Sequence, residues 1–123
     1  MITKVLHTGF AVPNLETSIQ FYKSLGFSVE KTFDKPELNA RAAMISRGET
    51  TFELFEFSTS DNPQVNFIRN HIALYSNDLE TDLTAMLTKD YVLTIPVTEG
   101  VLYRYAYVQD SAGTNYELAT DKN

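Results

Sequence analysis

The sequence predicts an α+β fold built from two tandem modules of the same order, β-α-β-β-β. Strand-like and helix-like segments follow one another in that order twice along the chain. One constant shift superimposes the two halves, and it aligns a Leu-Glu-Thr identity at the start of both helices, at residues 15–17 and 79–81. With 123 residues and 43% hydrophobic side chains, the chain has the size and apolar content of one compact domain.

In the first half, residues 4–12 are predicted to form a strand that Pro13 ends. Asn14 is a preferred N-cap residue, apolar residues at helical spacing follow it, and Gly26 provides the C-terminal stop. The sequence then predicts a strand, a turn and two further strands, at residues 27–33, 34–37, 41–46 and 51–57.

In the second half, residues 71–75 are predicted to form a strand, and Asp78 caps a helix whose apolar residues recur from Leu79 to Leu87. Three further strands are predicted at residues 92–97, 102–109 and 114–119. We therefore expect one domain over residues 1–123, with a first module at 1–57, a polar linker at 58–69 and a second module at 70–123.

The composition excludes several classes of partner. The formal net charge is −6 and the pI is about 4.8, a balance that argues against nucleic acid and anionic membranes. The chain has no cysteine, so neither disulfides nor thiolate chemistry are available. No signal-like or membrane-spanning apolar segment is recognisable, and we expect a soluble cytoplasmic protein that acts on a small molecule.

The repeat brings four chemically distinctive residues into register. The same shift places His7 on His71 and Glu53 on Glu117, so each half has a histidine and a glutamate at one spacing. These are the only two histidines in the chain. Each of the four is predicted to lie within a strand, and the shared register suggests that they form one site.

A metal ion explains why carboxylates lie on largely apolar strands. Taken singly, a strand histidine is usually a packed residue and a strand glutamate usually faces solvent. A carboxylate on an apolar sheet face is costly unless it is paired or coordinated, and four ligands around one divalent ion remove that cost together. Imidazole and carboxylate ligands suit Ni, Zn, Co, Mn or Fe(II).

The residues beside this quartet suggest a small-molecule pocket. Ala11 shares a strand face with His7 and leaves space, while Phe55 and Phe57 share a face with Glu53 and supply apolar walls. Arg41 and Arg104 could hold an anionic substrate, although they do not fall on the repeat. A row of tyrosines on the predicted strand at 102–109 is interpreted as packing or dimer contacts.

These features resemble the vicinal oxygen chelate superfamily, which includes glyoxalase, bleomycin resistance and extradiol dioxygenase proteins. The resemblance is closest to metal-binding members similar to lactoylglutathione lyase (glyoxalase I). The motifs that carry it are His7, the helix at 14–22 with Ser24-Leu25-Gly26-Phe27 at its end, Glu53, Asn70-His71-Ile72-Ala73, and the turn at 110–113 before Tyr116-Glu117-Leu118.

The resemblance implies a glyoxalase-like fold, in which paired βαβββ modules form a curved sheet cleft with the helices outside. It also implies a homodimer and one divalent metal ion held by His7, Glu53, His71 and Glu117. In short members of this type, one chain often supplies the first pair of ligands and its partner the second. The sequence leaves open whether the site forms within one chain or between two.

The activity implied by the resemblance is that of a metal-dependent lyase or isomerase of glyoxalase type. Such an enzyme abstracts a proton next to a carbonyl, and its metal stabilises the enediolate. By resemblance, Glu117 is the first choice for the catalytic base, and Glu53 is the partner ligand that could also serve.

Two departures from the family pattern concern the substrate. Glutathione-handling members commonly have an arginine where this chain has Ala11, and often an asparagine where it has Phe57. Whether a thiol such as glutathione is used therefore stays open. Other functions of the superfamily also stay open: an Fe(II) ring-cleaving dioxygenase, a non-catalytic module that binds small molecules or antibiotics, and a metal-dependent thiol transferase acting on an antibiotic.

Overall fold

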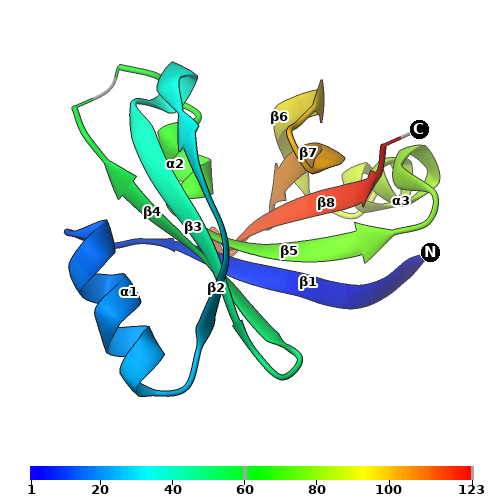
Figure 1. Cartoon of the computed structure of the whole chain (residues 1–123). Coiled ribbons are helices and arrows are strands. Elements are labelled where there is room, and N and C mark those ends of the chain that lie inside the picture. Colours follow the sequence, from blue (N-terminus) through cyan, green and yellow to red (C-terminus); the bar gives the residue numbers. More distant parts are fainter. Residues whose placement is uncertain (60, 123) are drawn as a thin grey trace. The chain divides into compact units, whose positions relative to one another are not determined.

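The computed structural model describes residues 1–59 and 61–122, which form a mixed eight-stranded sheet with helices packed against it (Figure 1). The chain divides into two compact units. The first unit is His7–Asn70, and the second combines Met1–Leu6 with the chain from His71 onward. The predicted α+β class is confirmed. The module boundaries stay a prediction, and residues 60 and 123, which that prediction includes, lie outside the described residues.

The first unit contains a four-stranded sheet of order β2-β3-β4-β1, in which β1 runs parallel to β4 and the other neighbours are antiparallel. Its elements are β1 (Ile2–Ala11), α1 (Leu15–Ser24), β2 (Ser28–Lys35), the 3₁₀ turn η1 (Pro36–Leu38), β3 (Ala40–Arg47), β4 (Thr50–Phe57) and α2 (Val65–Ile68). The first residues of β1 belong to the second unit, so this strand is shared.

In the second unit the strands have the order β1-β5-β8-β7-β6, where β1 contributes its first residues, and β5 is parallel to β8. Its elements are β5 (Asn70–Ser76), α3 (Leu79–Leu87), β6 (Val92–Glu99), β7 (Tyr103–Gln109) and β8 (Asn115–Asp121). The predicted order of elements is therefore present in both halves of the chain. None of the described helices has the length and apolar character needed to cross a membrane.

Two local predictions differ from the structure. The predicted turn at 34–37 is instead the end of β2 followed by η1, because Asp34 and Lys35 still pair with β3 and Pro36 opens the 3₁₀ turn. The segment expected to be a linker contains the single-turn helix α2, which buries Val65 and Ile68.

Helix α1 begins and ends for local chemical reasons. The Asn14 side chain accepts a hydrogen bond from the Thr17 backbone N–H at 2.9 Å, which satisfies one of the unpaired donors of the first turn. Gly26 follows the helix with a φ of 94°, a conformation that favours glycine. The Glu56 carboxylate of β4 accepts from the Leu15 N–H at 2.7 Å and ties the start of the helix to the sheet.

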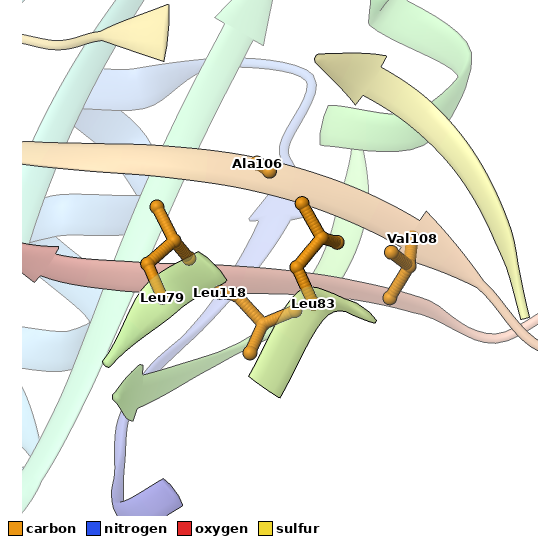
Figure 2. Packing of buried hydrophobic residues seen from close by; sticks show 5 residues of the cluster. All are labelled: Leu79, Leu83, Ala106, Val108 and Leu118. Atoms are coloured by element: carbon orange, nitrogen blue, oxygen red, sulfur yellow. The ribbon is translucent and has the colours of Figure 1, made fainter. Parts of the chain in front are cut away.

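Each long helix covers one face of the sheet in its own unit. In the first unit, Leu15 packs with Ala43, Ile45 and Leu54. In the second unit, Figure 2 shows α3 and the sheet in contact through Leu79, Leu83, Ala106, Val108 and Leu118. Since side chains alternate along a strand, the residues between these core positions lie on the opposite face.

Replacement of Leu83 by alanine tests the α3 core. We expect Leu83→Ala to lower the free energy of unfolding by about 2–5 kcal/mol, because a buried leucine leaves a cavity. The matched control is Leu87→Ala on the same helix, where the side chain is 40% exposed and the expected loss is about 1 kcal/mol or less. Urea unfolding measures both, and equal losses would contradict the packing described.

Candidate metal centre

The first His–Glu pair is positioned by the parallel ladder of β1 and β4. Gly9 lies in register with Glu53, and His7 precedes Gly9 by two residues, so the two side chains share one face of the sheet. The His7 Nε2 atom lies 3.2 Å from Glu53 Oε1. This is the face opposite to that covered by α1, because Leu54, the neighbour of Glu53, packs with Leu15.

The second pair repeats this arrangement on β5 and β8. Ala73 lies in register with Glu117, and His71 precedes Ala73 by two residues. The His71 Nε2 atom lies 3.4 Å from Glu117 Oε1. Leu118 packs under α3, which leaves Glu117 on the uncovered face. The structure thus brings the predicted ligands together as two equivalent His–Glu pairs, one in each unit.

The side chains of His7, Glu53, His71 and Glu117 are all buried. Histidine and glutamate groups of this kind could hold a metal ion. Glu53 and Glu117 are each only 7% exposed. A buried carboxylate loses its hydration, and a nearby imidazole offsets only part of that loss unless it is protonated. The donor set is nitrogen and carboxylate oxygen without sulfur, which fits a borderline divalent metal ion. The residues present therefore fit the metal that the sequence predicts.

The neighbouring strand distinguishes the two pairs. Met44 of β3 lies in register with Glu53, whereas Tyr107 of β7 lies in register with Glu117. The Tyr107 hydroxyl lies 3.4 Å from His71 Nε2, and the two rings meet edge to face with centroids 5.2 Å apart. The second pair therefore has a phenol beside it, whereas the first has a thioether.

Tyr107 was predicted to be a packing or dimer contact, as one of the tyrosines that alternate on its strand. The constant shift between the halves aligns it with Ala43 and not with Met44, so the repeat does not reveal its position beside Glu117. The shift fails at this strand because the connection from β7 to β8 is longer by one position than that from β3 to β4. Ser46 pairs with Thr51, whereas Gln109 pairs with Asn115. A search that allowed one insertion would have found the equivalence.

The tyrosine row on β7 lies in an acidic environment. Burial and the carboxylates of Asp121 and Glu117 raise the pKa of Tyr103, so its hydroxyl stays protonated well above neutral pH. Tyr105 packs edge to face on Tyr107 with ring centroids 5.7 Å apart. The Tyr107 ring therefore contacts both Tyr105 and His71.

The predicted pocket residues of the first unit lie along the face that carries His7 and Glu53. Ala11 and Phe57 line a cavity of about 430 Å³. Phe55 is buried and stacks on Phe57, with ring centroids 5.4 Å apart and an interplanar angle of 16°. Arg69 also lines this cavity. It was not predicted to be a binding residue, because its segment was predicted to be a linker.

Arg41 and Arg104 do not line this cavity. Arg41 pairs with Glu16 of α1, and Arg104 pairs with Glu80 of α3. Each arginine lowers the pKa of its glutamate through the hydrogen bond between them. Both arginines share a strand face with helix-packed residues, opposite to the face of the buried glutamates. The repeat aligns their partners, Glu16 and Glu80. The two arginines therefore occupy equivalent positions in the two units, although the constant shift does not align them.

A family model described as the Glyoxalase/Bleomycin resistance protein/Dioxygenase superfamily matches residues 4–118. The chain belongs to this superfamily. The resemblance inferred from the His–Glu register and the helix motifs is thereby confirmed. No match was found among curated proteins.

Solved structures similar to this superfamily member share its fold across nearly the whole chain. A hypothetical protein from Bacillus halodurans C-125 is 24% identical, with a TM-score of 0.81 over 98% of this chain and 95% of that one. A variant of Streptomyces coelicolor methylmalonyl-CoA epimerase in complex with 2-nitronate-propionyl-CoA is 23% identical, with a TM-score of 0.82 over 100% of both chains. Mycobacterium tuberculosis methylmalonyl-CoA epimerase is 17% identical, with a TM-score of 0.82 over 99% and 90%.

Proposed function

We propose that this protein is a metal-dependent lyase or isomerase that moves a proton next to a carbonyl group. The observation that carries the proposal is the duplicated buried pair, His7 with Glu53 and His71 with Glu117, at equivalent positions of two parallel ladders. Two such pairs supply the four ligands of a single divalent ion. The likeness of the fold to methylmalonyl-CoA epimerases, whose name describes inversion at a carbon, adds support.

His7, Glu53, His71 and Glu117 would hold the ion. When bound, the metal would supply Lewis-acid stabilisation of the negative charge that develops on the substrate's carbonyl oxygen. The union of the two pairs in one site is part of the proposal. It can arise within one chain, or between the subunits of a homodimer that exchange their pairs.

The residues of the chain perform the proton transfer. The Glu117 carboxylate removes the proton from the carbon next to the carbonyl, and the electron pair of that C–H bond moves towards the carbonyl oxygen. The protonated carboxyl group then returns the proton to the neighbouring carbon on the same side of the enediolate. Inversion at the original carbon would need a second carboxyl group on the opposite face, a role open to Glu53. Tyr107 and its contact with His71 give this pair a polar neighbour, and we therefore keep Glu117 as the base and Glu53 as the alternative.

The substrate class follows from this chemistry. The hemithioacetal of an α-keto aldehyde and an acyl thioester both have an acidified C–H next to a carbonyl, so both belong in the test. A ring-cleaving dioxygenase is less well supported, because that chemistry uses two histidines and one carboxylate, whereas two carboxylates are present here. A non-catalytic binding module would not need the four buried ligands.

Replacement of the base tests the proposal. Hydrogen exchange into D₂O, followed by NMR, reports proton abstraction directly for α-keto aldehydes with and without thiols and for acyl thioesters. For the substrate that exchanges with the parent protein, we expect Glu117→Gln to slow exchange by about 10²-fold or more, because general base catalysis contributes about that factor.

The matched variant is Glu53→Gln, which alters the equivalent ligand in the first unit. We expect it to retain more exchange than Glu117→Gln at equal metal content. Undiminished exchange by metal-loaded Glu117→Gln would exclude Glu117 as the base. Absence of exchange with every compound in the panel would oppose proton transfer as the function.

Mixing two inactive variants distinguishes the two arrangements of the site. One variant lacks the first pair (His7→Ala with Glu53→Ala), and the other lacks the second pair (His71→Ala with Glu117→Ala). If subunits exchange pairs, a mixed dimer contains one intact site, and metal binding and exchange activity return on co-refolding. If each chain builds its own site, the mixture stays inactive. A homodimeric parent protein of unchanged size is the control.

A further inference from the structure

The cavity next to Ala11 lies on the same sheet face as the first His–Glu pair. His7 and Ala11 lie four positions apart on β1, and Glu53 and Phe57 lie four positions apart on β4, so all four side chains point to one side. The cavity is formed entirely within the first unit. The residues that line it include Ala11, Pro13, Phe57, Ser58, Thr59 and Arg69.

Arg69 is the cation of this cavity. Its guanidinium carbon lies 5.6 Å from the centre of the Phe57 ring, close enough for a cation–π contact. The other arginines of the described chain have protein partners: Arg41 and Arg104 pair with glutamates, and Arg47 donates to the Leu25 carbonyl at 2.5 Å. No carboxylate among the described residues pairs with Arg69, although acidic residues outnumber basic ones in this chain.

The backbone fixes Arg69 at the edge of the cavity. Its carbonyl oxygen accepts a hydrogen bond from the Ala11 N–H at 2.8 Å, and its own N–H donates to the Val65 carbonyl at 3.1 Å. A guanidinium that contacts an aromatic ring still has its N–H groups in its own plane, where they can bind two oxygens of a planar or tetrahedral anion. Ser58 and Thr59 also line this cavity, and hydroxyl side chains can donate hydrogen bonds to an anion.

We propose that this cavity binds an oxyanion, a carboxylate or a phosphate, at the far end of the substrate, and that Arg69 is the residue that recognises it. Four strand positions separate this end from the His–Glu pair, a distance of about 13 Å at the usual rise. Phe55 lies between Glu53 and Phe57 on the same strand face, and its ring stacks on that of Phe57. The substrate is therefore elongated, with an apolar middle and a terminal anion about 1 nm from its reactive carbonyl.

The position of the reactive carbonyl rests on the proposed function, whereas the anion site does not. Binding of small probes therefore tests the site without turnover. Phenylacetate and phenyl phosphate present the two anions on an aromatic ring, and phenylacetamide is the neutral counterpart of the carboxylate. Calorimetry or NMR titration of the protein as purified measures each Kd.

We expect Arg69→Gln to weaken phenylacetate and phenyl phosphate by about tenfold or more, the loss expected for a charge-assisted hydrogen bond. Arg69→Lys should recover part of the affinity. Arg41→Gln, which removes the same charge from the helix-covered face of the same unit, should leave both unchanged. Phenylacetamide should bind more weakly than phenylacetate and should not respond to Arg69→Gln. The anion that binds more tightly identifies the terminal group.

Equal affinities of the acid and the amide would overturn the proposal, as would anion binding that survives Arg69→Gln or no anion binding by the parent protein. Loss of anion binding in Arg69→Gln together with undiminished proton exchange in Glu117→Gln would uphold the cavity and reject the proposed base. The reverse pair of results would uphold the base and reject the anion site.

Discussion

Glu53 and Glu117 are buried on a sheet face, and the free energy of holding a carboxylate there constrains the rest of the structure. Each has an imidazole nitrogen within 3.4 Å, which places a donor beside it but does not by itself replace water. A divalent ion would remove the cost for both glutamates together. The shared geometry of the two pairs is therefore typical of a ligand set.

The two ladders produce this geometry because a parallel strand pair fixes both face and register. In each ladder the histidine lies two residues before the residue that pairs with the glutamate. His7 precedes Gly9, which pairs with Glu53, and His71 precedes Ala73, which pairs with Glu117. The crossover from each first strand passes through a helix, and α1 and α3 cover the opposite face through Leu15 and Leu79. In each unit the apolar core thus lies on one face of its strands, and the His–Glu pair lies on the other face. In the first unit that other face also carries the cavity beside Ala11.

Much of this could be predicted because the chain repeats itself. The order of elements, both N-caps and the His–Glu register follow from one constant shift between the halves. The role of Tyr107 could not be predicted in that way, because the longer connection after β7 breaks the shift. Arg69 lies in a polar segment without periodicity, and only the backbone hydrogen bond to Ala11 reveals that it borders the cavity. Arg41 and Arg104 were predicted to be able to hold an anionic substrate because they are cationic, but the structure pairs them with Glu16 and Glu80.

The most direct test of the account is the metal stoichiometry of the purified protein, measured by elemental analysis after loading with Ni or Zn and dialysis. A four-ligand site predicts one ion per chain. If both pairs hold the same ion, as proposed, either His7→Ala or His71→Ala should lose it. Two ions per chain, each lost with only one of the histidines, would show that the pairs act separately. No bound ion at all would mean that the buried pairs are structural, and would contradict the account.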